Sequence, residues 1–347
     1  MKIIDLRSDT VTLPTQTMRQ AIYDADLGDD VFGEDPTTNR LEKMAAERIG
    51  KEAAMMVASG TMGNLVCILT HCKRGEEVIL GDQSHSFLYE AGGMSALGGI
   101  HPHTVVNQPD GTMRLEDIEA AIRDENIHFP RTRLICLENT HNYCEGSPLT
   151  AKYTKEVAAL AHKHNLKVHL DGARIFNAAV ALGADVRELA GPVDSVSFCL
   201  SKGLSAPIGS VICGSGEFIY EARRNRKILG GGMRQCGIIA AAGIIALEQM
   251  TERLAEDHTN ARRLAEGIAK IPGLSLDPKS IRTNIIYFNL SSKKLSAGIL
   301  VKQLADQGIK VLQLGPALLR VVTHYGISSE NIETTLTVLR KIMEESD

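Results

Sequence analysis

Four short segments of this 347-residue chain carry side chains that could take part in chemistry, and each follows a short apolar run. The segments are 59–64 (SGTMGN), 82–85 (DQSH), 171–174 (DGAR) and 201–203 (SKG). In an open parallel sheet the carboxyl ends of the strands meet at one edge, and ligands bind beyond that edge. If the apolar runs are strands, the sequence predicts that these four segments form one site.

The segment 59–64 has the small residues of an anion-binding turn. Such residues let backbone N–H groups approach an anion, and the N-terminus of the helix that follows favours negative charge. A phosphate group is the expected ligand, although small residues are also typical of a tight connection between a strand and a helix. The chain has no G-x-G-x-x-G motif, which disfavours a dinucleotide.

The other three segments supply a histidine, a carboxylate and a lysine. His85 by itself is more typical of a structural hydrogen bond, and Asp171 would need a partner, either the next helix as its cap or a cationic ring nitrogen of a ligand. Lys202 could reach the surface, but a lysine desolvated in a cleft is a nucleophile toward carbonyl groups. A phosphate turn, a carboxylate and a lysine at successive strand ends match the needs of pyridoxal phosphate.

The elements that must position these residues follow an alternating order. Short apolar runs indicate strands at 53–58, 77–80, 134–137, 168–170, 196–200 and 210–213, and helical patterns lie at 36–49, 115–123 and 154–164. Strands that alternate with helices predict a mostly parallel sheet covered on both faces.

A different order begins after a long helical pattern over 234–271. It predicts a strand at 284–290, a helix at 297–307, strands at 309–312 and 318–322, and a helix at 332–343. We therefore predict an α/β large domain over residues 1–250 and a smaller C-terminal α+β domain over residues 251–347, with the first residues able to pack against the small domain.

Composition excludes several classes of protein. With 38 Lys+Arg, 42 Asp+Glu and 44% hydrophobic residues, the chain is globular and slightly acidic, which disfavours a nucleic-acid partner in spite of the basic run 223–227. The longest apolar run, 237–247, is shorter than the ~20 residues that cross a bilayer. Seven cysteines without a C-x-x-C motif, and no apolar secretory segment at the start, predict a cytoplasmic location.

Two histidine pairs, His101/His103 and His162/His164, have the spacing i, i+2. On a helix this spacing does not direct two side chains to one ligand, so we expect surface residues and no metal site.

Eight ordered motifs identify a family resemblance over nearly the whole chain. They are 6–12 (LRSDTVT), 28–36 (GDDVFGEDP), 59–64, 138–142 (ENTHN), 171–174, 201–203, 230–235 (GGGMRQ) and 320–324 (RVVTH). The chain resembles the L-threonine aldolases, pyridoxal-phosphate lyases with the aspartate-aminotransferase-like (type I) fold. It departs from the family at 143–148 (YCEGSP), where a glycine-rich turn is more usual.

The resemblance implies a role for each cofactor-binding residue. Lys202 would bond the cofactor covalently, Asp171 would face the pyridine nitrogen, and His85 would stack on the ring. Arg174 would bind the phenolic oxygen. The phosphate would be bound by Ser59, Gly60, Thr61 and Arg234, with Lys227 nearby.

The resemblance also implies how the substrate is held. Ser8 and Arg320 would bind the substrate carboxylate, an arrangement that suits the fork of an arginine. His128 would approach the substrate hydroxyl, and Tyr89 would lie near the same pocket. Either His85 or His128 could be the base, and the sequence does not rank them.

The implied reaction is cleavage of L-threonine, L-allo-threonine and related β-hydroxy-α-amino acids to glycine and an aldehyde, acetaldehyde in the case of threonine. A β-eliminating lyase or an aminotransferase of the same fold would also need Lys202 and Asp171, so these two residues do not discriminate. The preference between the two threonine diastereomers stays open. The type I fold builds its site at a dimer interface, which implies a homodimer or, as the family suggests, a homotetramer.

Overall fold

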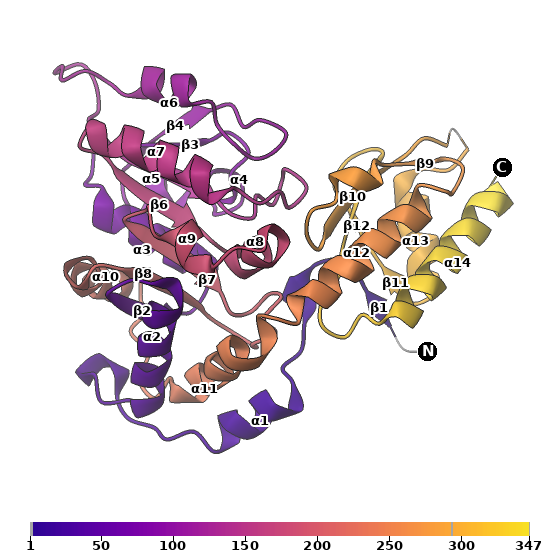
Figure 1. Cartoon of the computed structure of the whole chain (residues 1–347), viewed down its shortest axis with the longest axis horizontal. Coiled ribbons are helices and arrows are strands. Elements are labelled where there is room, and N and C mark those ends of the chain that lie inside the picture. Colours follow the sequence, from indigo (N-terminus) through magenta and orange to yellow (C-terminus); the bar gives the residue numbers. More distant parts are fainter. Residues whose placement is uncertain (1–2, 293, 347) are drawn as a thin grey trace.

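A computed structural model describes residues 3–292 and 294–346 and contains two units that lie side by side (Figure 1). The larger unit is built on a seven-stranded sheet, and the smaller unit on a four-stranded sheet near the C-terminus. The fold is the predicted α/β type with a mostly parallel central sheet.

The large sheet carries all the strand ends that were predicted to form the site. Its strands, in spatial order, are β2 (Ala53–Val57), β8 (Ser210–Gly214), β7 (Ser195–Cys199), β6 (Lys167–Asp171), β5 (Thr132–Glu138), β3 (Glu77–Gly81) and β4 (His101–Val105). Five neighbouring strands from β7 to β4 are parallel, and β8 is antiparallel to both β7 and β2. Strand β2 therefore runs in the same direction as β7, and its carboxyl end lies at the same edge.

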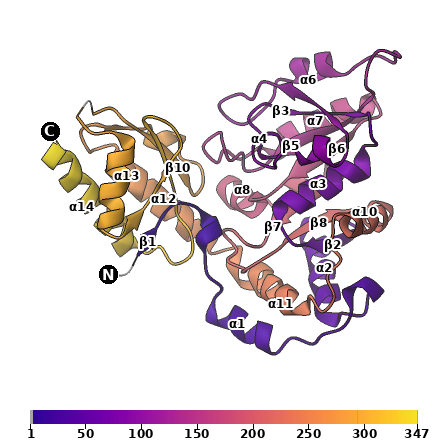
Figure 2. The ribbon, with the colours of Figure 1, turned by 180° about the vertical axis from the view of Figure 1, so that it is seen from behind.

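Helices cover both faces of this sheet, as the continuous apolar runs predict. The helices of the large unit are α1 (Gln16–Tyr23), α2 (Pro36–Ile49), α3 (Gly60–His71), α4 (His85–Leu88), α5 (Gly93–Ala96), α6 (Leu115–Ala121), α7 (Ala151–Lys163), α8 (Ile175–Leu182), α9 (Val186–Ala190), α10 (Gly216–Ile228) and α11 (Gly237–Ile245). In β2, Met56 packs into the core with α2, α7 and α8, whereas Met55 and Val57 pack against α3 and α10 on the other face. Figure 2 shows α10 beside β2 and β8.

Local chemistry sets the bounds of α2, which the sequence predicted. Asp35 Oδ1 accepts a hydrogen bond from the N–H of Thr38 at 2.8 Å, and Pro36 occupies the first turn. The helix ends at Gly50, whose φ of 77° is left-handed and favours glycine.

The smaller unit contains both the first and the last residues that the structure describes. Its sheet has the order β12 (Leu312–Gln313), β13 (Leu318–Val322), β10 (Ile285–Leu290) and β9 (Leu274–Ser275), and its helices are α12 (Leu254–Ile268), α13 (Ala297–Asp306) and α14 (Ser329–Ser346). Strand β1 (Ile4–Asp5) pairs in parallel with β11 (Ile309–Lys310), so Ile4 and Leu6 are part of this core (Figure 1).

Two C-terminal segments differ from the prediction. The helical pattern over 234–271 is interrupted, because a π-helical turn (Ala246–Met250) and residues 251–253 separate α11 from α12. The strand predicted at 309–312 is two short strands, β11 and β12, which belong to different sheets. Residue periodicity marks an element type but not where a tertiary contact bends the chain.

The prediction that placed His101 and His103 on a helix is wrong. They lie on β4, an edge strand that the sequence analysis missed, and residues i and i+2 of a strand share a face. A ring nitrogen of each histidine lies near the carboxylate of Glu77, at 3.8 Å for His101 and 3.3 Å for His103. The same carboxylate accepts a hydrogen bond from Arg123 Nε at 2.7 Å.

His162 lies near the end of α7, and His164 is its C-cap. Their ring nitrogens contact different carboxylates, Asp194 at 2.9 Å and Glu119 at 3.4 Å.

Within the described ranges, no helix combines the length and the apolar character that a membrane span requires.

We predict that Gly172→Ala lowers the free energy of unfolding by about 1–3 kcal/mol. A Cβ atom at Gly172 would lie 2.6 Å from the backbone oxygen of Ser197 on β7, and backbone cannot rotate away as a side chain can. Urea unfolding measures the loss. Gly298→Ala is the matched control, because its Cβ would meet nothing closer than Gln313 Oε1 at 3.5 Å and alanine is the better helix former. A control as unstable as Gly172→Ala would contradict the steric explanation.

Candidate active site

The four predicted segments lie at the same edge of the large sheet. Ser59 follows β2, His85 follows β3, Asp171 ends β6 and Lys202 follows β7. All four strands run in the same direction, so these residues gather at the carboxyl ends.

A buried amide joins the carboxylate of Asp171 to a second acid that the sequence analysis did not single out. Asn64 Nδ2 donates to Asp171 Oδ2 at 2.7 Å and to Glu90 Oε1 at 2.8 Å. Asp171 Oδ1 accepts the N–H of Ala173 at 3.0 Å. Asp171 is not the N-cap of α8, because Arg174 occupies that position. Its carboxylate is therefore held in place for another partner.

His85 is tied to the same cluster through Glu90. Its Nδ1 lies 2.9 Å from Glu90 Oε1, and His85, Glu90 and Asp171 each offer one polar atom within 4.8 Å of the others. Burial alone would lower the pKa of His85, but the hydrogen bond to Glu90 and the charge of Asp171 raise it above its usual value. Burial raises the pKa of Glu90. This spacing also suits metal ligands, so the absence of a metal from the reaction stays a prediction.

Glu138 fixes the backbone from which His85 projects. Its Oε2 accepts the N–H of His85 at 2.6 Å, and its Oε1 accepts the N–H of Asn142 at 2.7 Å. One carboxylate at the end of β5 therefore sets the start of α4 and the turn that follows β5.

A buried ion pair joins the N-terminal segment to the end of β6. Arg174 donates from Nε and Nη2 to the two carboxylate oxygens of Asp9, each at 2.7 Å, and both side chains are almost fully buried. Burial opposes ionisation, yet the Arg174 charge holds the pKa of Asp9 well below its usual range, and Asp9 in turn raises the pKa of Arg174. The remaining nitrogen, Nη1, makes only a 3.4 Å contact with Asn142.

Arg320 and Lys202 are cations left without partners near this pair. Arg320 is buried on β13, and its Nε has no hydrogen-bond partner among the described residues. Burial together with the charge of Arg174 lowers its pKa. Lys202 Nζ forms no hydrogen bond or ion pair with any residue that the structure describes, although its charge acts on Asp9 and His85. Unpartnered cations beside a buried carboxylate indicate a site that an anionic ligand completes.

The N-terminus of α3 has the geometry of an anion site. Ser59 caps the helix, because its Oγ accepts a hydrogen bond from the N–H of Met62 at 3.2 Å. The N–H groups of Gly60 and Thr61 belong to the first turn and therefore have no partners within the helix. Gly231 packs against Met62, which brings the 230–235 segment to this helix. Within that segment Arg234 is exposed and pairs with Asp29 at 2.9 Å, and Lys227 is exposed on α10.

Two further predicted residues, Ser8 and Tyr89, lie next to other residues of the site. Ser8 precedes Asp9 and accepts the N–H of Thr10 at 3.2 Å. The exposed ring of Tyr89 is centred 5.6 Å from the ring of His85 and acts electrostatically on Arg320.

His128 is the one predicted residue that the fold does not bring to this edge. It lies on the exposed loop before β5, whose seven residues span roughly 20 Å, so it is at the amino end of the strand. The adjacent Phe129 packs under Arg123, which bonds Glu77 at the start of β3.

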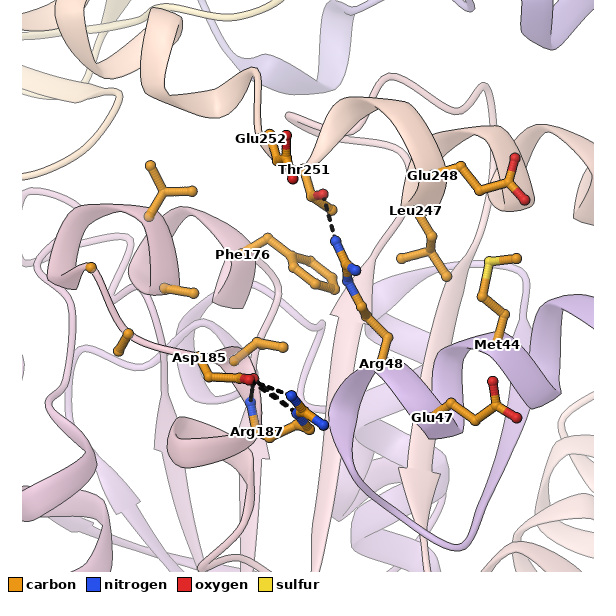
Figure 3. A pocket seen from close by; sticks show the side chains of 15 residues that line it. Met44, Glu47, Arg48, Phe176, Asp185, Arg187, Leu247, Glu248, Thr251 and Glu252 are labelled. Atoms are coloured by element: carbon orange, nitrogen blue, oxygen red, sulfur yellow. Dashed lines mark hydrogen bonds and ion pairs between the residues drawn. The ribbon is translucent and has the colours of Figure 1, made fainter.

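The large hollow in Figure 3 is not this site. Its volume is about 800 Å³, and it lies between α2, α8 and the turn before α12. Arg48 crosses it to donate to Thr251 at 3.0 Å, with Phe176 and Leu247 as apolar walls. None of the predicted site residues lines it.

Residues 5–291 match the model of the beta-eliminating lyase family. A probable low-specificity L-threonine aldolase from Arabidopsis thaliana is 51% identical over 99% of this chain and 98% of its own length. The low specificity L-threonine aldolase of Escherichia coli K12 is 44% identical over 95% of this chain and 96% of its own length.

The chain belongs to the L-threonine aldolase family.

Solved structures agree on the fold of this threonine aldolase family member. A threonine aldolase from Leishmania major has a TM-score of 0.83 and 18% identity, and the match covers 98% of this chain and 99% of that one. A putative L-allo-threonine aldolase from Listeria monocytogenes has a TM-score of 0.79 at 20% identity, covering 94% and 92% of the two chains.

We predict that Asp9→Asn destabilises this threonine aldolase family member by about 3–5 kcal/mol, because it leaves Arg174 buried without a counter-charge. Urea unfolding with and without the substitution measures the loss at neutral pH. Because the pKa of Asp9 is lowered in the folded protein, its contribution to the free energy of unfolding is present above about pH 3.9, the pKa of an aspartate in the unfolded chain. The difference in stability between the unmodified protein and Asp9→Asn should therefore shrink as the pH falls below that value.

Asp185→Asn is the control for the ion pair. Asp185 pairs with Arg187 at 2.6 Å on the surface, and asparagine can still cap α9. The control should unfold almost as the unmodified chain does. Equal losses in both variants would mean that burial of the Asp9 pair has no special importance.

Proposed function

We propose that this protein is a pyridoxal-phosphate-dependent aldolase that cleaves L-threonine and L-allo-threonine to glycine and acetaldehyde. One observation carries the proposal: the unpartnered cations Lys202 and Arg320 converge on the Asp9–Arg174 pair, beside the buried carboxylate of Asp171. Membership of the L-threonine aldolase family supports the same substrate class.

The residues at the strand ends fit pyridoxal phosphate. The free amine of Lys202 is available for covalent attachment, Asp171 offers a fixed negative charge for the pyridine nitrogen, and Nη1 of Arg174 is available for the phenolic oxygen. The N–H groups of Gly60 and Thr61, with Ser59 and the exposed Arg234 and Lys227, suit the phosphate. When bound, the cofactor supplies the electron sink that lets the Cα–Cβ bond of an amino acid break.

The small unit supplies the group that holds the substrate. Arg320 on β13 has its Nε unpaired inside the protein, so a carboxylate that binds there removes the cost of burying the cation. Ser8 and Tyr89 border the same space, and Thr12 Oγ1 donates to the backbone oxygen of Lys202 at 3.1 Å. The N-terminal segment thereby connects the substrate-binding arginine to the lysine.

His85 is the histidine of this chain that lies beside the cluster. With Nδ1 engaged by Glu90, its Nε2 is the nitrogen that can take a proton from the substrate hydroxyl. His128 would reach a substrate only in the site of a second copy, because it lies at the opposite end of β5. A role for His128 in catalysis therefore requires a site shared between subunits, as in the homodimer or homotetramer that we propose.

A β-eliminating lyase is the alternative function, favoured by the family description that covers residues 5–291. It would use the same Lys202 and Asp171 but release ammonia and a keto acid in place of glycine and an aldehyde.

The cysteines bear on the compartment. All seven are buried free thiols, which supports a reducing compartment, and we propose the cytoplasm.

The first test is Lys202→Ala. We expect the folded variant to lose the yellow colour of the lysine-bound cofactor and to turn over threonine at less than about a thousandth of the normal rate. Aldehyde and glycine are quantified together, beside ammonia and keto acid. Lys341→Ala, which changes an exposed lysine on α14, is the control and should be fully active. If the unmodified enzyme releases ammonia and a keto acid from threonine, the protein is an eliminating lyase and not an aldolase.

The second test separates the two histidines. His85→Asn should weaken cofactor binding, shift the absorption spectrum and slow turnover, because His85 is expected to stack on the ring. His128→Phe should leave the spectrum unchanged and alter KM and the ratio of threonine to allo-threonine cleavage by roughly 5- to 150-fold, the value of one lost hydrogen bond at the hydroxyl. A changed spectrum with an unchanged ratio in His128→Phe would reverse the two assignments.

A further inference from the structure

Two histidines lie behind Asp171, and neither takes part in the function proposed above. His169 is on β6, two positions before Asp171, and residues i and i+2 of a strand share a face. It is 1% exposed, so its ring nitrogens need partners inside the protein. His71 is partly buried at the end of α3, where its ring stacks on Phe218 with the ring centres 4.6 Å apart.

The register of two parallel strands gathers the polar groups around His169. On β7, Ser195 lies opposite His169, and Ser197 lies opposite Asp171. Helix α3 packs across both strands and brings Asn64 to the same place. The hydroxyl of Ser197 donates to Asn64 Oδ1 at 2.8 Å, and His169 Nε2 lies 3.2 Å from the same oxygen.

The two acids of the site fix which way the amide of Asn64 faces. Its Nδ2 lies 2.7 Å from Asp171 Oδ2 and 2.8 Å from Glu90 Oε1, and carboxylate oxygens accept hydrogen bonds. A reversed amide would set its own oxygen against both of them. The oxygen therefore faces His169, so the hydrogen of that imidazole is on Nε2.

The remaining hydrogen bonds follow from this tautomer. With its hydrogen on Nε2, His169 accepts at Nδ1, so Ser195 Oγ donates to it at 2.9 Å. A serine has one O–H, so His71 Nε2 donates to Ser195 Oγ at 2.8 Å. Burial lowers the pKa of His169 to about 4 and that of His71 to about 3, so both rings are neutral near pH 7. Each of these donors thus points along the chain toward Asn64.

We propose that His169 is a positioning residue, which donates from Nε2 to the amide of Asn64 and thereby fixes the carboxylate of Asp171 toward the ring nitrogen of the cofactor. It acts through Asn64 and does not contact the reacting atoms. The inference rests on the proposed function for the partner of Asp171, whereas the tautomer of His169 is independent of that function.

The carboxylate of Asp171 depends on this support because it has few other donors. Its Oδ1 accepts the N–H of Ala173, and its Oδ2 accepts from Asn64. Without His169, the oxygen of Asn64 keeps only Ser197 as a donor, and the amide can turn. A carboxylate that is less well oriented binds a protonated ring nitrogen more weakly, and contacts with the phosphate are unaffected.

The experiment compares two cofactors on the full-length enzyme after its own cofactor has been removed. Dissociation constants are measured for pyridoxal phosphate and for its 1-deaza analogue, which has a carbon atom in place of the ring nitrogen. His169→Met fills a similar volume without a donor. We expect it to bind pyridoxal phosphate about fivefold more weakly, the value of one net hydrogen bond, and the analogue with unchanged affinity.

Three variants complete the comparison. His169→Gln keeps an amide donor near the position of Nε2 and should bind both cofactors as the unmodified enzyme does. Asp171→Asn should show the same selective loss as His169→Met, to a larger extent. His258→Met is the matched control: His258 is buried on α12 and accepts from Asn177 Nδ2 at 3.2 Å, away from Asp171, so both affinities should be unchanged.

The pattern of the two affinities decides the role of His169. Equal weakening of both cofactors in His169→Met means a general structural role and overturns the proposal, as does an unchanged affinity for pyridoxal phosphate. A glutamine variant as weak as the methionine variant overturns the hydrogen bond as the cause. If the unmodified enzyme binds neither cofactor, the proposed function fails, and the positioning role fails with it.

Neutron diffraction on the unmodified enzyme, exchanged into heavy water, tests the tautomer whether or not the variants fold. We expect a deuteron on Nε2 of His169 and none on Nδ1, with the hydroxyl of Ser195 directed at Nδ1. A deuteron on Nδ1 of His169 overturns the inference even where the cofactor and the reaction are as proposed.

Discussion

The ion pair between Asp9 and Arg174 is the contact on which the arrangement of the site depends. Each group is buried so completely that it would be strongly destabilising without the other. Asp9 belongs to a segment that pairs with the small unit through β1 and β11, and Arg174 begins α8 in the large unit. The pair therefore fixes Arg320 of one unit relative to Lys202 of the other.

The same rule of burial explains the polar groups beneath the site. Asp171 and Glu90 are both buried acids, and a single amide, Asn64, donates one hydrogen to each. His85 and Glu138 complete the pairing around them. Protein groups satisfy these acids, whereas Arg320 Nε and the amine of Lys202 have no partner in the described chain, so both cations are available to an anionic ligand.

The likeness to solved structures at 18–20% identity concerns the fold, and a type I fold hosts several reactions. The chemistry of the site depends on the residues at its strand ends. A histidine backed by Glu90 lies beside Asp171, and an arginine on a separate unit faces the same space. The hollow between α2 and α8 has a volume of about 800 Å³ but contains none of these groups, so its size does not make it the site.

The sequence by itself determined the strands of the large sheet, apart from the edge strand β4, and the residues that follow them. Buried parallel strands are continuous apolar runs, so the residues after each run, such as Asp171 and Lys202, were predictable as neighbours at one edge. The limits of α2 were equally local, because Asp35, Pro36 and Gly50 act on their own backbone.

Only the tertiary structure decided the partners of those residues. Asn64 contacts Asp171 across 107 positions and Arg174 contacts Asp9 across 165, distances over which no periodicity carries information. The edge strand with His101 and His103 has polar residues because one side is open, so it lacked the apolar signal of its neighbours. The motif resemblance named His128 as a site residue, but the direction of β5 places it at the far end of the strand. Local patterns encode the type of an element, whereas the packing of the whole chain decides which side chains meet.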